Sequence, residues 1–313
     1  MTFPLLTLAL RWGGPILSAC NDCVIALFAQ DLGDLACIFV AANGLAIMPL
    51  ELTSVVHGKL CHGSRWKIAD EDDLASRVAQ LALGQSRHVA AILAGIDKKA
   101  PATRADTAKE AIKLLTVANG KDPYHRDGWI FQAISWIAAY RSDAGAVVRA
   151  PHAIVAHKGF DGMQLKLDEH GDTVTAVVIF EDKATENPRK MITGDVWSGI
   201  RALECGERMP ELIQETGAIL EANQLRYPEL DIDAAIETIL WEEVRHYRVA
   251  VTSVDVHDDD DVRQALFKGF DKVAPGSRKR RQAETMCIPA LRDWMQTFAI
   301  RAIMHIEAWR DDV

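Results

Sequence analysis

The spacing of apolar and polar residues divides the chain into parts with different predicted structure. The first 100 residues are rich in apolar runs, and they show strand and helix patterns over 5–10, 37–42 and 70–93. A long helical pattern covers 283–310, with apolar and aromatic residues recurring on one face. We therefore expect an accessory region over 1–100 and a main domain over 101–313 that includes this C-terminal helix.

Two helices are predicted at the start of the main domain, over 103–117 and 128–140. The second helix has Asp127 as its predicted N-cap and is apolar almost all round, which predicts that it is buried. Apart from Ser135, its one polar side chain on the inner turns is Gln132. A buried amide requires hydrogen-bond partners, so we expect Gln132 to face another polar group.

Strand patterns and a glycine-flanked bend follow the buried helix. Asp161 lies in the bend between Gly159 and Gly162, and strands are predicted over 153–157, 163–167 and 173–183. Later helices and a further strand are predicted over 194–206, 210–223, 232–243 and 247–256. The order of one helix, three strands, several helices and a strand predicts an α/β fold, with a mixed β-sheet flanked by helices.

The long strand over 173–183 carries the residues of greatest chemical interest. It is apolar through Phe180 and then changes to Glu181-Asp182-Lys183. Because side chains alternate along a strand, Glu181 and Lys183 share one face. The hairpin brings Asp161 to the same end of the sheet. Two carboxylates and an amine at a sheet edge form a compact site for a divalent cation and a polarised water.

These residues resemble the motif of the PD-(D/E)XK nuclease superfamily, which includes restriction enzymes, repair exonucleases and bacterial defence effectors. The resemblance implies that Asp161 and Glu181 bind Mg²⁺ or Mn²⁺, and that Lys183 assists the attacking water. It also implies a further metal ligand in the backbone carbonyl of Asp182, and a place near the site for Gln132 on the preceding helix. The implied fold is a restriction-endonuclease-like sheet.

Two positions depart from the pattern of this superfamily. Phe160 stands where the motif name places a proline, and the helix over 128–140 has no glutamate, so its contribution to the site rests on Gln132. The resemblance covers about 60 of the 313 residues. Its support comes from the context of the motif: the hairpin, the apolar strand, and the helices before and after.

Charge restricts the functions that fit this composition. The net charge is −9, which argues against a passive nucleic-acid coat protein, because such proteins gain most of their affinity from neutralising phosphates. An enzyme with an acidic metal site remains compatible with this balance. Candidate contacts to a nucleic-acid backbone are the dense basic cluster Arg278, Lys279, Arg280 and Arg281, followed by Arg189 and Lys190.

Other interpretations of the same residues stay open. Glu181 and Lys183 also fit an exposed ion pair at a strand end, and Asp161 also fits a turn residue that accepts local hydrogen bonds. The resulting alternative function is a non-catalytic, nuclease-like subunit that acts as a protein-interaction module. A third function is a metal hydrolase that acts on a small phosphoester. The aspartate run over 258–261 fits a solvated turn better than a metal cluster.

The chain has six cysteines, and Cys20, Cys23 and Cys61 with His57 have the ligand types of a zinc site. Reduced thiols are the other interpretation, and the one we prefer, because we expect no export signal and a cytoplasmic protein. No apolar run reaches the length of a membrane span, so we expect no membrane association.

The expected function is hydrolysis of phosphodiester bonds in nucleic acid, with DNA favoured over RNA and Mg²⁺ or Mn²⁺ as the cofactor. Because no motor or specificity region is evident in the sequence, we expect a protein partner, such as a helicase or sensor subunit, to control the enzyme. Among bacterial proteins this pattern resembles an anti-phage defence effector, by analogy alone.

Overall fold

A computed structural model describes residues 48–143, 147–151 and 159–310, together with the backbone of three short strands before residue 48. These strands are β1 (Leu17–Cys20), β2 (Cys23–Ala26) and β3 (Phe39–Ala41), which form a small antiparallel sheet within the compact unit Met1–Ile47. The strand predicted over 37–42 is confirmed as β3. The strands predicted over 5–10 and 153–157 lie outside the described residues.

The unit from Met48 to Val313 is built on a seven-stranded mixed sheet in the order β4-β5-β10-β9-β8-β7-β6. The strands are β4 (Leu50–His57), β5 (Cys61–Ile68), β6 (Val147–Val148), β7 (Gly162–Leu167), β8 (Val174–Lys183), β9 (Arg245–Ser253) and β10 (Arg281–Cys287). The central strands β5, β10, β9 and β8 are parallel, and the pairings toward both edges are antiparallel. The predicted mixed α/β sheet is therefore present.

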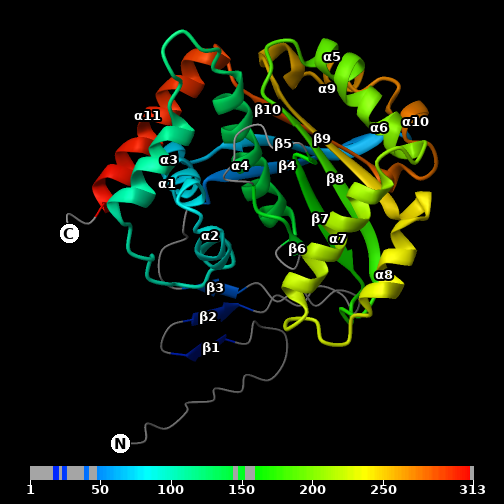
Figure 1. Ribbon diagram of the computed structural model, residues 1–313, viewed down its shortest axis with the longest axis horizontal. Helices are drawn as coiled ribbons and strands as arrows, with labels where there is room; N and C mark the ends of the chain where they lie inside the picture. Colours follow the sequence, from blue (N-terminus) through cyan, green and yellow to red (C-terminus); the bar gives the residue numbers. More distant parts are fainter. Residues whose placement is uncertain are drawn as a thin grey trace, which may run out of the picture. The chain divides into compact units, whose positions relative to one another are not determined.

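Helices cover both faces of this sheet (Figure 1). One face is covered by α1 (Glu71–Ala82), α2 (Ser86–Leu93), α3 (Ala105–Leu115), α4 (Tyr124–Ser142) and α11 (Leu291–Trp309). Helices on the other face include α6 (Trp197–Glu204), α7 (Met209–Asn223), α8 (Ile232–Ile239), α9 (Asp260–Leu266) and α10 (Phe270–Val273). A short helix α5 (Pro188–Met191) continues through a π-helical turn, Ile192–Val196, into α6. Two apolar cores thus enclose the sheet.

Strand β8 shows how the sequence pattern sets this arrangement. Val177 and Ile179 belong to the core under α6 and α7, whereas Val178 and Phe180 pack toward α4. The alternation continues into the charged end of the strand, so Glu181 and Asp182 are carried to opposite faces of the sheet. The apolar part of β8 anchors the strand, and its charged end is held at the carboxyl edge of the parallel strands.

Several helix predictions are confirmed and two details are wrong. The pattern over 70–93 is helical but is divided into α1 and α2 at Gly84, whose φ of 74° lies in the left-handed region. Asp127 is not an N-cap, because α4 begins at Tyr124 and Asp127 lies inside it, fully buried. Its carboxylate pairs instead with Arg126 and Arg292.

The long helix predicted over 283–310 is wrong in its first part. The segment Arg281–Cys287 forms β10, the strand between β5 and β9, and the helix begins at Leu291. The predicted boundary near residue 100 is also wrong, because the main unit begins at Met48 and includes β4 and β5. Among the described helices, none is long and apolar enough to cross a membrane.

Candidate active site

Three separate segments meet at the carboxyl end of β8: helix α4, the bend before β7, and β8 itself. Gly162 opens β7 and pairs with Phe180, which places the preceding residue, Asp161, beside Glu181. A Cβ atom at Gly162 would lie 2.6 Å from a ring carbon of Phe180. Glycine is therefore needed at this position for the bend to approach β8 so closely.

The predicted site residues are in direct contact. The Lys183 Nζ atom lies 2.7 Å from Asp161 Oδ2 and 3.0 Å from Glu181 Oε2. The Gln132 side-chain amide donates to Asp161 Oδ1 at 2.7 Å, and the Asp182 backbone N–H donates to Asp161 Oδ2 at 2.9 Å. Both oxygens of Asp161 are thus fixed, and Gln132, which is half-buried on α4, has a polar partner as the sequence led us to expect.

Burial and charge determine the protonation of this group. Burial raises the pKa of Glu181, and the Lys183 ammonium offsets only part of that effect. Burial lowers the pKa of Lys183, but the Glu181 and Asp161 carboxylates raise it by more, so the net pKa is raised and the amine stays protonated. The three side chains remain 12–20% exposed, which leaves them accessible to a ligand.

The Asp182 carboxylate points away from this group, toward α4. It is buried, and burial raises the pKa of Asp182 to about 7, against a smaller lowering effect of Arg248. Arg248 lies between the Trp66 and Phe180 rings and donates to the Ser135 hydroxyl and backbone carbonyl. Asp182 therefore contributes its main-chain N–H to the site, and the metal-ligand role of its carbonyl stays a prediction.

A fifth side chain near the site, Asp195, is absent from the sequence prediction. Its Oδ2 atom lies 3.9 Å from Lys183 Nζ, and its side chain is 68% exposed. Asp195 lies in the π-helical turn before α6, a local geometry that the helical pattern over 194–206 does not reveal. The sequence signal was a lone aspartate beside Gly194, which by itself indicates only a turn or a helix start.

The donor set of the site fits a hard divalent cation. Asp161 and Glu181 direct carboxylate oxygens at one cationic atom, Lys183 Nζ, so the two groups converge on a single point. Mg²⁺ and Mn²⁺ prefer such oxygen ligands, and Mg²⁺ keeps several waters, so two carboxylates are enough. Within the described ranges, no group of three or more His, Cys, Asp or Glu side chains is placed to hold a metal ion.

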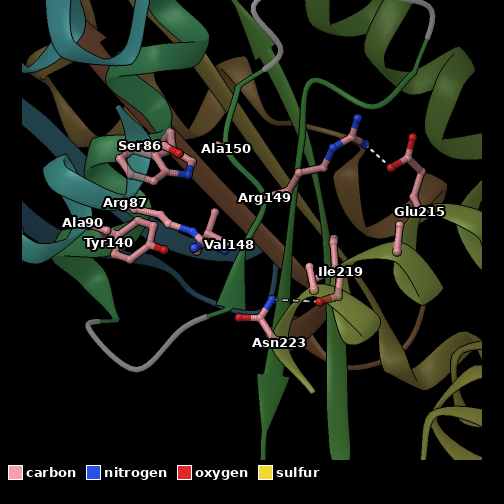
Figure 2. A pocket seen from close by; sticks show the side chains of 13 residues that line it. Ser86, Arg87, Ala90, Tyr140, Val148, Arg149, Ala150, Glu215, Ile219 and Asn223 are labelled. Carbon is pink, nitrogen blue, oxygen red and sulfur yellow. Dashed lines mark hydrogen bonds and ion pairs between the residues drawn. The ribbon is translucent and has the colours of Figure 1, made fainter. Parts of the chain in front are cut away.

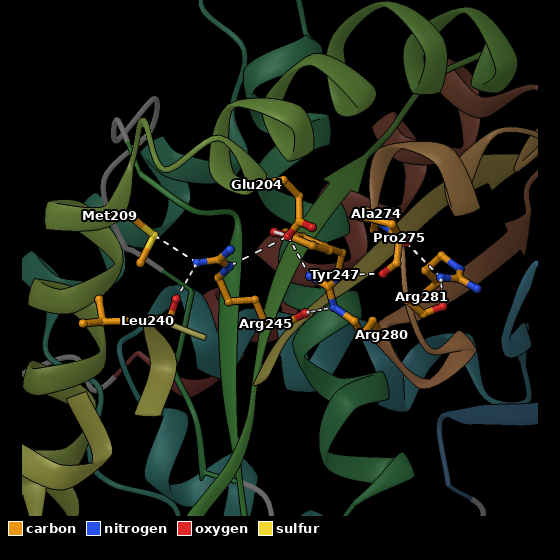
Figure 3. Close-up of polar contacts among 10 residues, drawn as sticks. Glu204, Met209, Leu240, Arg245, Tyr247, Ala274, Pro275, Arg280 and Arg281 are labelled. Carbon is orange, nitrogen blue, oxygen red and sulfur yellow. Dashed lines mark hydrogen bonds and ion pairs between the residues drawn. The ribbon is translucent and has the colours of Figure 1, made fainter. Parts of the chain in front are cut away.

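Figure 3 shows two of the four residues of the predicted basic cluster, Arg280 and Arg281, with their side chains hydrogen-bonded to other parts of the protein. Arg280 donates to the carbonyls of Arg245 and Pro275 and to Glu204. Arg281 donates to four backbone carbonyls, those of Lys59, Leu60, Ala274 and Gly276. Both side chains are buried, so in this arrangement they are not available to a phosphate and the contact expected from them is not supported.

The remaining basic candidates differ in their availability. Arg278 and Lys279 are exposed, although Arg278 donates to the Gly58 carbonyl. Arg189 donates to the carbonyls of Leu266 and Lys268, and burial lowers its pKa, whereas Lys190 is exposed. The basic cluster also lies away from the site along the direction of the strands. Lys183 of β8 and Thr285 of β10 both pair with Val251 of β9, so they are at the same level of the sheet. Arg281 lies four residues before Thr285, at the start of β10.

Of the four residues predicted as zinc ligands, the structure describes the side chains of His57 and Cys61, and neither is free to bind a metal ion. His57 and Cys61 face each other at the end of the β4–β5 hairpin. The Arg263 guanidinium lies 2.7 Å from His57 Nε2, and burial raises the pKa of Cys61 to about 11. A cation against the imidazole and a protonated thiol both oppose zinc binding. The side chains of Cys20 and Cys23 lie outside the described residues.

A separate hollow of about 370 Å³ is lined by residues of α2, α4 and α7 and by residues 148–150 (Figure 2). Arg149 and Glu215 form an ion pair in its lining, and the Asn223 side chain donates to the Ile219 carbonyl. Asp161, Glu181 and Lys183 are not among the residues that line it. The candidate active site is therefore distinct from this cavity.

Comparison of the chain with protein-family models, with curated proteins and with solved structures finds no match. The functional interpretation consequently rests on the geometry of the site.

Proposed function

We propose that this protein is a metal-dependent nuclease with a restriction-endonuclease-like fold of the PD-(D/E)XK superfamily. The observation that supports the proposal is the meeting of Gln132, Asp161, Glu181 and Lys183, from three separate segments, at the end of β8. Their order along the chain and their placement on a helix, a bend and a strand match the motif. A chance ExK sequence does not explain why Gln132 and Asp161 converge on it.

Each residue has a distinct task in phosphodiester hydrolysis. Asp161 and Glu181 would hold Mg²⁺ or Mn²⁺, which when bound neutralises charge on the phosphate and acidifies a water molecule. Gln132 and the Asp182 N–H fix the orientation of Asp161, one on each oxygen. Lys183 stays protonated, so it acts as a hydrogen-bond donor that orients water or stabilises the developing charge, and not as a base.

The substrate in this proposal is DNA in preference to RNA. Control by a protein partner, such as a helicase or a sensor subunit, and a role in anti-phage defence belong to the same proposal and rest on the resemblance alone.

The alternative is a nuclease-like subunit without catalysis. One observation favours it: Lys183 already satisfies both carboxylates, so the group is electrostatically stable without a metal.

The test is incubation of the purified protein with linear and circular DNA in Mg²⁺, Mn²⁺ or EDTA. Glu181→Gln should abolish metal-dependent cleavage, because it removes one charge that holds the cation while keeping the shape of the side chain. Glu169→Gln, in the exposed turn between β7 and β8, removes the same charge away from the site and should have no effect.

Equal activity of the Glu181→Gln variant and the unsubstituted protein would contradict the proposed site. If neither protein cuts DNA or RNA, alone or with a captured partner, the non-catalytic alternative is favoured.

A further inference from the structure

The candidate active site carries excess negative charge. Asp161, Glu181 and Asp195 surround the single ammonium of Lys183. A nucleic-acid strand brings a phosphate at every nucleotide, so a backbone that enters this site requires a cation besides Lys183 and the metal. Among the basic residues predicted from the sequence, Arg280 and Arg281 are buried and Arg189 is bound to carbonyls, whereas Arg278, Lys279 and Lys190 are exposed.

Arg208 lies next to the bend that carries Asp161. Its guanidinium carbon is 4.3 Å from the centroid of the Phe160 ring, and Phe160 directly precedes Asp161. Phe160 is buried, so its ring is a fixed platform for the guanidinium. This contact links Arg208, just before α7, to the position of a catalytic carboxylate.

A second contact fixes the orientation of Arg208. Its Nε and Nη2 atoms donate to the two oxygens of Glu211 at 2.8 and 2.7 Å. The hydrogen bonds to Glu211 raise the pKa of Arg208, and the charges of Glu181 and Asp161 raise it further, so the guanidinium keeps its charge. No acceptor for Nη1 occurs in the described part of the chain, and the side chain is 28% exposed.

We propose that Arg208 binds a backbone phosphate of the nucleic-acid strand at the mouth of the active site. The inference rests on the proposed nuclease function and adds to it a specific contact to a polynucleotide. The flat guanidinium suits this task because it donates to phosphate oxygens in a fixed plane. Phe160 and Glu211 hold that plane before the substrate arrives, with Nη1 left for the phosphate.

The experiment measures binding and cleavage of a fluorescently labelled DNA duplex by full-length protein with Arg208→Ala or Arg208→Lys. Binding is followed by anisotropy over a range of salt concentrations, with Ca²⁺ in place of Mg²⁺. The matched control is Arg226→Ala. Arg226 also stacks on an aromatic ring, that of Tyr227, but it lies beyond the opposite end of α7.

Arg208→Ala should weaken binding about tenfold, raise KM more than it lowers kcat, and reduce the slope of log Kd against log salt by about one. Arg208→Lys should recover part of the affinity, because it keeps the charge without the planar fork, and Arg226→Ala should bind as the unsubstituted protein does. Circular dichroism establishes that each variant is folded.

Equal affinity and salt dependence of Arg208→Ala and Arg226→Ala would overturn the inference. Cleavage that Glu181→Gln abolishes would in that case still support the nuclease. If the unsubstituted protein binds no DNA or RNA, alone or with a captured partner, both the inference and the nuclease proposal fail.

Discussion

Gln132 shows how far a single residue can be interpreted from the sequence. A polar amide on an otherwise apolar helix requires a partner, and the structure supplies Asp161 Oδ1 at 2.7 Å. The sequence could not identify which group would be the partner, because that depends on how α4 packs against the bend before β7. In the proposed function Gln132 positions Asp161, and its effect on activity should follow from that contact.

Gln132→Leu should lower cleavage activity by roughly 10- to 100-fold, the usual cost of removing a group that orients a metal ligand. It should also weaken Mn²⁺ binding, which calorimetry measures without turnover. A matched control is Gln164→Leu, because Gln164 is a buried amide that donates to Asp143, the residue after the end of α4. If both variants lose activity equally, the effect is one of stability and Gln132 has no positioning role.

Asp182 should make the stability of the protein depend on pH. Burial raises its pKa to about 7 in the folded protein, above the ordinary value of 3.8. Between these two values the folded protein retains a proton that the unfolded chain has lost, so this residue makes the folded state less stable as pH rises from about 4 to 7. Above pH 7 its contribution should be constant.

Asp182→Asn removes this titration and keeps the shape of the side chain. The free energy of unfolding of the variant minus that of the unsubstituted protein should therefore rise between pH 4 and 7, by at most about 1.4 kcal/mol per pH unit. Urea unfolding at several pH values measures this difference. A difference that is flat over the range, or that falls with pH, would contradict the raised pKa.

At the scale of elements, β8 was predictable and β10 was not. Alternation of apolar residues ending in Glu181-Asp182-Lys183 indicates a strand, and the hairpin follows from the glycines beside Asp161. The segment Arg281–Cys287 contains good helix formers, glutamine, alanine, glutamate and methionine, and its pattern continues into that of α11. Its strand conformation is set by pairing with β5 and β9, which no local pattern reveals.

Arg263 on α9 stabilises this part of the sheet. It is fully buried and donates to the Thr285 hydroxyl, to His57, and to the carbonyls of Ser64 and Ala283. Arg263→Met should lower the free energy of unfolding by about 3 kcal/mol or more, because it leaves several buried acceptors without a donor. Urea unfolding tests this, with Arg87→Met as the control, because Arg87 is an exposed residue of α2. Equal stability of the two variants would contradict the structural role.

At the scale of the whole molecule, the sequence placed the domain boundary about 50 residues too late. The change in composition near residue 100 suggested that everything before it was accessory. In the structure, β5 lies beside β10, so His62 is paired with Gln282 although 220 residues separate them along the chain. Composition cannot reveal a pairing of that range, and β4, β5, α1 and α2 were therefore assigned to the wrong unit.

The corrected boundary predicts which part of the chain folds by itself. Residues 48–313 form one compact unit that contains the complete seven-stranded sheet and all the residues of the candidate site. A chain that begins at Met48 should therefore unfold cooperatively, within a few degrees of the main transition of the 313-residue chain, and should retain the proposed Glu181-dependent cleavage. A chain that begins at residue 101 lacks β4, β5, α1 and α2, and should not fold, because β10 would lose one neighbour and the core under α4 would be opened. Differential scanning calorimetry of both truncated chains distinguishes the two boundaries. A cooperative transition in the shorter chain would restore the boundary near residue 100.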